Sequence, residues 1–137
     1  VNRGGARMDA GEKQQYWMEL AEYDLETAKV MLDGGRYLYV GFMCHQVIEK
    51  ALKGYYVAII LEDPPFIHNL TILAKKAEIF ELFSDEHKDT LDLLEPLNIE
   101  ARYPTVKDKL LKSLTKERCV TILHKTEVLF TWIKARF

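Results

Sequence analysis

The sequence has few of the features that mark secreted, membrane-spanning or metal-binding proteins. Its 137 residues contain only two cysteines, Cys44 and Cys119, which lie far apart and form no CxxC pair. We therefore expect reduced, buried thiols and a cytoplasmic protein. The longest uninterrupted apolar run, 55–61, is too short to cross a membrane. The four histidines show no metal-ligand spacing, so we expect no metal site. We also expect no cofactor and, because the apolar run is short, no membrane association.

Two further patterns are missing from the chain. No segment alternates apolar and polar residues as a half-buried strand does, and no glycine-rich phosphate-binding loop is present. Helical periodicity instead covers most of the sequence, so we predict an all-α fold, a five-helix up-down bundle. Residues 1–11 are interpreted as a leader or vector remnant. Residues 12–137 are predicted to form a single domain, since the chain has the length of one.

Apolar periodicity and capping residues predict the helix boundaries. The predicted helices cover 12–33, 36–61, 69–82, a segment from Ser84 to about residue 97, and 116–135. Gly34-Gly35 ends the first helix, and Pro64-Pro65 ends the second. Residues 98–112 are predicted to be irregular, because Pro104 forces Tyr103 out of helical geometry.

The second predicted helix carries a polar line on the side that we expect to face outward. His45, Glu49 and Lys53 recur at i, i+4 and i+8, with Lys50 on the adjacent line and apolar residues at both ends. One interpretation is an ordinary solvated ion pair. The other is a second contact surface with a chemically selective centre, near a partner or a ligand.

Charge is distributed unevenly along the chain. Residues 1–100 carry 10 basic and 18 acidic side chains, whereas residues 101–137 carry 9 basic and 3 acidic ones. This asymmetry indicates either a site for an anionic ligand or a basic C-terminal helix that packs on an acidic body. The overall net charge of −2 argues against a generic nucleic-acid-binding protein.

Three polar residues outside the second helix need an explanation. Asp24 falls in the middle of the apolar face of the first helix, where a carboxylate requires a partner. Arg102 and Tyr103 lie in the predicted loop, where such residues are often functional. Alternatively, Tyr103 closes the end of the bundle while Arg102 neutralises Asp24 or Glu49.

Four stretches, in order, resemble the HEPN family (higher eukaryotes and prokaryotes nucleotide-binding domain). They are WMELAEYDLETAKVML at 17–32, GFMCHQVIEKALKGYYV at 41–57, HNL at 68–70 and ARYP at 101–104. The last stretch resembles the Arg-Tyr-Pro branch of the family, and the whole is similar to the C-terminal domain of kanamycin nucleotidyltransferase. The resemblance implies a five-helix bundle of the nucleotidyltransferase substrate-binding-subunit type, which usually dimerises.

Our principal functional hypothesis from this resemblance is a non-catalytic HEPN module. It forms a homodimer through the second helix and its neighbours, and binds a nucleotide or RNA phosphate, a partner minimal nucleotidyltransferase in a toxin–antitoxin-like system, or both. A purely structural assembly domain, in which the polar line specifies the dimer, is an alternative. The candidate ligand-binding residues are His45, Glu49, Lys50, Lys53, His68, Arg102 and Tyr103, followed by Lys107 and Lys109.

A metal-independent ribonuclease toxin is the remaining alternative. RNA-cleaving members of the family carry Arg-x(4–6)-His, because the arginine holds the phosphate and the histidine moves the proton. Arg118 and His124 match this spacing and are the catalytic candidates for such an activity. Arg102 together with a histidine from another helix is the alternative pair. Arg118 and His124 share one predicted helix, however, where a six-residue step leaves the side chains about 120° apart.

Overall fold

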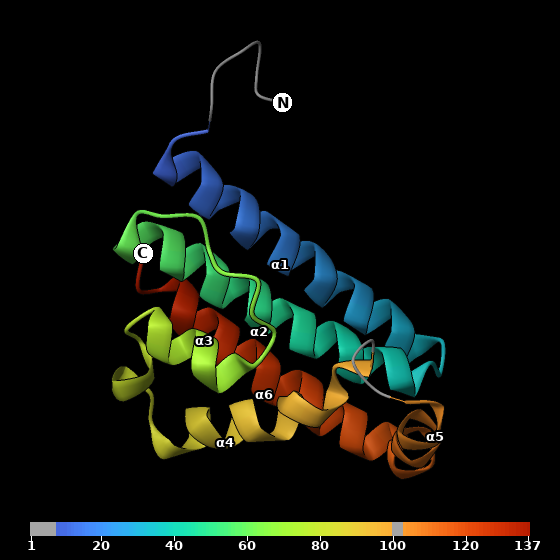
Figure 1. Ribbon diagram of the computed structural model, residues 1–137. Coiled ribbons are helices and arrows are strands. Elements are labelled where there is room, and N and C mark those ends of the chain that lie inside the picture. Colours follow the sequence, from blue (N-terminus) through green and yellow to red (C-terminus); the bar gives the residue numbers. More distant parts are fainter. Residues whose placement is uncertain (1–7, 100–102) are drawn as a thin grey trace.

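The computed structural model describes residues 8–99 and 103–137, and in these ranges every regular element is helical (Figure 1). The predicted all-α bundle is confirmed, with one α-helix, α5, beyond the five expected. The elements are α1 (Ala10–Asp33), α2 (Tyr37–Ile60), α3 (Leu70–Lys76), η2 (Phe80–Leu82), α4 (Asp85–Leu94), η3 (Glu95–Leu97), α5 (Pro104–Ser113) and α6 (Lys116–Lys134).

Helix α2 lies at the centre of the bundle, with α1, α3 and α6 packed around it (Figure 1). Helices α1 and α2 form the antiparallel hairpin that the Gly34-Gly35 signal predicts, and Gly35 adopts a left-handed φ of 71° in the turn. The two helices approach closely at Gly54. A Cβ there would lie 3.1 Å from Met18 Sδ and 3.2 Å from the Cβ of Trp17, so the missing side chain lets Trp17 lie against α2.

The helix starts follow the capping residues in the sequence. The side chains of Asn69, Ser84 and Thr115 each accept a hydrogen bond from a backbone N–H three residues on. Helix α1 begins two residues earlier than predicted, because Asp9 and Glu12 form a capping box. Residues 1–7 lie outside the described residues, and their interpretation as a leader stays a prediction.

The predicted third helix, 69–82, is shorter in the structure. Helix α3 ends at Lys76, and Glu78 takes a left-handed φ of 63°. The N–H of Ile79 then donates to Ala74 O at 3.1 Å, which turns the chain so that Ile79 is fully buried. Burial of Ile79 therefore ends the helix, without a glycine at the turn.

The predicted irregular stretch 98–112 contains a helix. Tyr103 is extended, as expected for a residue before proline, with φ −70° and ψ 156°. Pro104, however, opens α5 at its first turn, where a missing N–H removes no helical hydrogen bond. The same proline thus ends one segment and starts the next.

Helix α6, the basic C-terminal helix, packs against α1 and α2 in the acidic body, as one interpretation of the charge asymmetry predicted. Lys134 of α6 pairs with Glu22 of α1, and Lys29 of α1 lies 3.6 Å from Glu127 of α6. Both cysteines are buried free thiols, and burial raises the pKa of Cys44 to about 12. None of the described helices is long and apolar enough to span a membrane.

Candidate functional site

The loop of residues 61–69, which joins α2 to α3, runs back along α2 (Figure 1). Through this loop His68 Nδ1 comes within 3.0 and 3.1 Å of the two carboxylate oxygens of Glu49. Lys53 Nζ donates to Glu49 Oε2 at 3.0 Å. The Glu49 and Lys53 side chains are 6% and 7% exposed, so this is an interior ion pair to which the loop contributes one histidine.

His45 lies one turn before Glu49 and is fully buried. Its Nδ1 is 3.8 Å from Glu49 Oε1, and its Nε2 is 3.7 Å from Glu95 Oε2, both beyond hydrogen-bonding distance. Neither ring nitrogen has a hydrogen-bond partner among the described residues. Burial lowers the pKa of His45, and the carboxylates of Glu49 and Glu95 oppose this only in part, so the ring is neutral at pH 7.

The expectation that His45, Glu49 and Lys53 face outward is therefore wrong. The 61–69 loop and the start of α3 close over them, and Glu95 fixes α3 there by accepting a hydrogen bond from the Leu70 N–H at 2.7 Å. A dimer contact through the middle of α2 would have to open the subunit. The polar line therefore cannot specify a dimer as the assembly hypothesis supposed.

Lys50 belongs to a second ion pair, which joins α2 to α1. Its Nζ donates to Asp24 Oδ2, and this supplies the partner that the buried carboxylate of Asp24 requires. Arg102 was one predicted partner of Asp24 or Glu49. Lys50 holds the first carboxylate, while Lys53 and His68 hold the second. Arg102 lies outside the described residues.

A cleft of about 360 Å³ opens where Lys53 meets the surface. Lys53 Nζ lies 5.7 Å from the centroid of the Trp17 ring, which forms one wall. Across the cleft, Lys13 Nζ donates to Asp63 Oδ1 at 2.6 Å and ties α1 to the loop. The complete lining is Lys13, Tyr16, Trp17, Lys53, Asp63, Pro64, Pro65 and Phe66. Two ammonium groups thus border a cavity with aromatic walls.

Most of the cleft residues were not among the sequence candidates. Lys13, Tyr16 and Trp17 lie about 40 residues or more before the loop, and the two prolines were interpreted only as the end of a helix. Phe66 gives the one local signal, because a large apolar residue directly after two prolines has no helical face to join. In the structure it is 98% exposed.

Comparison with known proteins identifies the fold. The model of the HEPN domain family matches residues 14–136. The chain belongs to the HEPN domain family. Two crystal structures share its fold. TT1696 from Thermus thermophilus has a TM-score of 0.78 and 20% identity, and the match covers 91% of this chain and 98% of that one. ST0689, an archaeal HEPN homologue, has a TM-score of 0.68 and 19% identity, and the match covers 90% of this chain and 97% of that one. A search of curated proteins gave no match.

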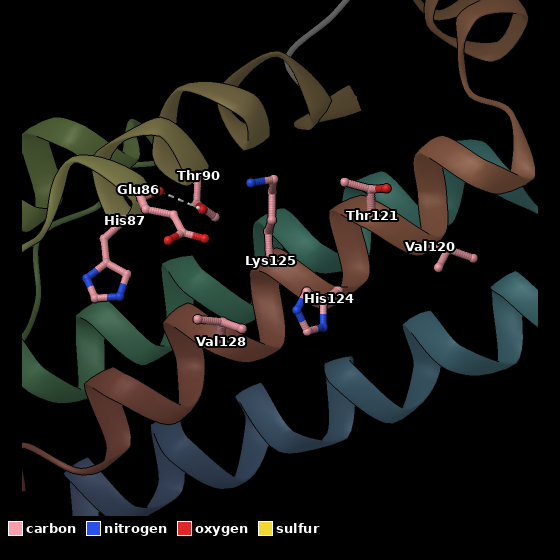
Figure 2. A pocket seen from close by; sticks show the side chains of 8 residues that line it. All are labelled: Glu86, His87, Thr90, Val120, Thr121, His124, Lys125 and Val128. Atoms are coloured by element: carbon pink, nitrogen blue, oxygen red, sulfur yellow. Dashed lines mark hydrogen bonds between the residues drawn. The ribbon is translucent and has the colours of Figure 1, made fainter.

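The ribonuclease candidates of this HEPN domain have different neighbours. Arg118 lies at the start of α6, and its Nη1 donates to Ser113 O at 3.3 Å. His124 instead borders a pocket of about 270 Å³ between α4 and α6, together with His87 and Lys125 (Figure 2). Arg118 does not line this pocket.

The two histidines of that pocket are also separated. The His87 ring packs on Trp132, with 4.9 Å between the ring centroids. Trp132 follows His124 by eight residues, which is about 12 Å along a helix. His87 Nδ1 accepts a hydrogen bond from the Ser84 N–H at 3.3 Å, and burial lowers its pKa, so the ring acts as a neutral cap of α4. This arrangement serves packing rather than proton transfer between paired histidines.

Tyr103, the remaining sequence candidate, is 81% exposed at the start of α5 and does not line the cleft beside Lys53. Lys107 and Lys109 lie on α5 as well. Of the candidates that the structure describes, His45, Glu49, Lys53 and His68 are brought together, and Lys53 alone also lines the cleft.

Proposed function

We propose that this HEPN domain is a non-catalytic module that binds a nucleotide in the cleft between α1, α2 and the 61–69 loop, and that forms a homodimer. The observation that supports the nucleotide site is the pairing of Lys13 and Lys53 with the aromatic walls of Tyr16 and Trp17 around one cavity. Ammonium groups bind phosphate, and aromatic faces stack on bases without requiring a particular one.

The roles of the candidate residues follow from their contacts. Lys53 is the proposed phosphate contact, and Glu49 and His68 position it and hold the loop. Lys13 is the second phosphate contact, since its partner Asp63 is 76% exposed and can give way to an anion. His45 and Lys50 have structural roles, because each faces a carboxylate inside the subunit and neither lines the cleft.

Titration calorimetry with ATP, GTP and their monophosphates tests the nucleotide site. We expect binding to the wild type, and a Kd raised about tenfold by Lys13→Gln, because a charge-assisted contact is worth about 1.5–3 kcal/mol. Lys29→Gln is the matched control, since Lys29 is a partly exposed lysine of the same helix that pairs with Glu26 and Glu127 away from the cleft. No heat with any nucleotide at millimolar concentration, or equal losses in both variants, would contradict the proposal.

The exposed Phe66 on the rim of the cleft supports a protein partner beside the nucleotide site. Following the family resemblance, we propose a minimal nucleotidyltransferase for that role. A small nucleotidyltransferase encoded beside this chain should co-elute with the wild type and be lost with Phe66→Ala. Co-elution that is unchanged by Phe66→Ala would remove Phe66 from the contact.

Ribonuclease activity has less support, because the Arg118 side chain is directed to Ser113 O and His124 lies in another pocket. We expect the wild type and His124→Ala to leave a labelled RNA equally intact. Cleavage by the wild type that His124→Ala abolishes would replace the non-catalytic assignment with the ribonuclease one.

A further inference from the structure

The middle of the outward face of α6 lacks the charged residues that a solvent-facing helix normally carries. Between residues 119 and 131 the exposed side chains are Val120, Thr121, His124, Val128 and Thr131, which we call the α6 face. Val120 and Val128 are 47% and 41% exposed. A helix that meets only water has a charged or strongly polar outer side, so the α6 face is of the kind that a partner covers.

The two charged side chains in this part of α6 are both turned sideways. Glu127 is directed to Lys29 on α1, with 3.6 Å between the charged atoms. Lys125 extends toward α4 and lines the pocket between the two helices (Figure 2). The α6 face is therefore a strip of small, uncharged groups with His124 at its centre, and another helix can approach it closely.

We propose that a second copy of this chain covers the α6 face, with the two α6 helices antiparallel and the two-fold axis at His124. Such an interface is isologous, so each residue meets the one equally far on the other side of the axis. Val120 then meets Val128 of the second copy. The inference rests on the homodimer in the proposed function and adds which surface forms it.

The polar residues beside the strip also fit this pairing. Glu117 meets Thr131 of the second copy, so this carboxylate faces a hydroxyl group that can donate to it. Two carboxylates do not oppose each other in this register. Antiparallel pairing about His124 is thus chemically complementary along the described length of α6.

Charge complementarity extends beyond α6. His87 packs on Trp132, so the N-terminus of α4 lies beside the C-terminal part of α6. This end of α4 carries Asp85, Glu86 and Asp89 against Lys88 and the nearby Arg136, and is net acidic, whereas α6 begins with Lys116, Glu117 and Arg118 and is net basic. The antiparallel arrangement places the basic end of each copy beside the acidic end of the other.

The length of the α6 face and the groove beside it are compatible with a dimer interface of standard size. A standard interface takes about 800 Å² from each partner, roughly a tenth of the accessible surface of 7926 Å². The 19 residues of α6 span about 28 Å. The groove of about 270 Å³ along α4 and the charged ends widen the contact on both sides.

The strip of Tyr16, Tyr23 and Val30 on α1 is more exposed but fits a second copy less well. A second copy on this strip would cover Tyr16, which lines the cleft proposed for the nucleotide. Val30 is therefore a matched control, because it is also an exposed valine on a long helix.

Sedimentation equilibrium of Val120→Asp, Val128→Asp and Val30→Asp tests the interface, with circular dichroism melts to verify that each variant folds. We expect a wild-type dimer, a dissociation constant raised at least about thirtyfold by either substitution on α6, and no change with Val30→Asp. In addition, Lys116→Glu and Asp89→Lys should each weaken the dimer, and their combination should restore it. A monomeric wild type, a dimer that survives both α6 substitutions, or one lost with Val30→Asp would overturn the proposal.

Nucleotide titration of the same variants separates this inference from the nucleotide site. The cleft lies against α1 and the 61–69 loop, so Val128→Asp should bind nucleotide as the wild type does. If no nucleotide binds and Val128→Asp still dissociates the dimer, the nucleotide site fails and the interface stands. If nucleotide binds and the wild type is monomeric, the interface fails and the nucleotide site stands.

Discussion

The polar line of α2 and the α6 face reverse the usual distribution of residues. His45, Glu49 and Lys53 are charged or titratable and lie inside the subunit, whereas Val120 and Val128 are apolar and lie outside. A buried charge is retained only where partners compensate it, and an exposed apolar strip is favoured where another surface covers it. This contrast underlies both proposals, in which the first region positions a site within the subunit and the second joins subunits.

The largest expected effect is on the interior pair. Glu49→Gln leaves Lys53 buried without its carboxylate, so the free energy of unfolding should fall by about 3–5 kcal/mol. The control is Glu127→Gln, whose partner Lys29 is 41% exposed, and it should cost less than about 1 kcal/mol. Urea denaturation measures both values. Similar small losses in the two variants would mean that Glu49 is solvated in the folded protein.

The next effect is a pH dependence caused by His45. Since burial lowers its folded-state pKa below the ordinary 6.5, the unfolded chain binds the additional proton as the pH falls below about 6.5. Stability should therefore decrease from pH 6.5 downward until the folded-state pKa is reached, by up to about 1.4 kcal/mol per pH unit from this residue. The carboxylates of Glu49 and Glu95 face the ring and oppose the shift.

Denaturation of the wild type and of His45→Gln between pH 7.5 and about 5 measures this contribution. The variant should be less stable at pH 7.5 yet show a shallower decline on the acid side. Parallel pH profiles would show that His45 titrates with the same pKa in both states.

A smaller effect on stability is expected from the α6 face, as a dependence of the melting temperature on protein concentration. If a second copy covers this face, a tenfold rise in protein concentration stabilises each folded dimer by about 1.4 kcal/mol. Each chain gains half of this value. The melting temperature of the wild type should therefore rise with concentration, and that of Val128→Asp should stay constant. Calorimetric scans over a hundredfold concentration range test this, and a constant wild-type value would contradict the interface.

The smallest effect on stability is expected at the rim of the cleft. Phe66 is almost fully exposed, so Phe66→Ala should change the free energy of unfolding by no more than about 0.5 kcal/mol. The same substitution should weaken nucleotide or partner binding measurably. A large loss of stability would show that Phe66 packs against the body and is not free for binding.

Local signals predicted most of the fold. The glycine pair at 34–35, the prolines at 64–65 and the caps Asn69, Ser84 and Thr115 each act within one helical turn, so the sequence alone reveals them. Two local inferences were incomplete, because their outcome depends on the rest of the bundle. Pro104 starts a helix as well as ending a segment, and burial of Ile79 shortens α3.

The site was harder to predict, because distant segments build it. The spacing of His45, Glu49 and Lys53 marked the correct line of α2, but its burial depends on a loop that folds back after two prolines. Lys13 and Asp63, which close the cleft, are 50 residues apart in the sequence. The residue pattern within one helix cannot predict such a contact.

The most direct test of the account is titration of ATP into Tyr16→Ala and Tyr23→Ala. Both tyrosines are exposed on α1 and lie two turns apart, but Tyr16 alone lines the cleft. The account predicts wild-type affinity for Tyr23→Ala and an affinity at least about fivefold weaker for Tyr16→Ala, because stacking on one aromatic ring is worth about 1–3 kcal/mol. Equal affinities in the two variants would contradict it.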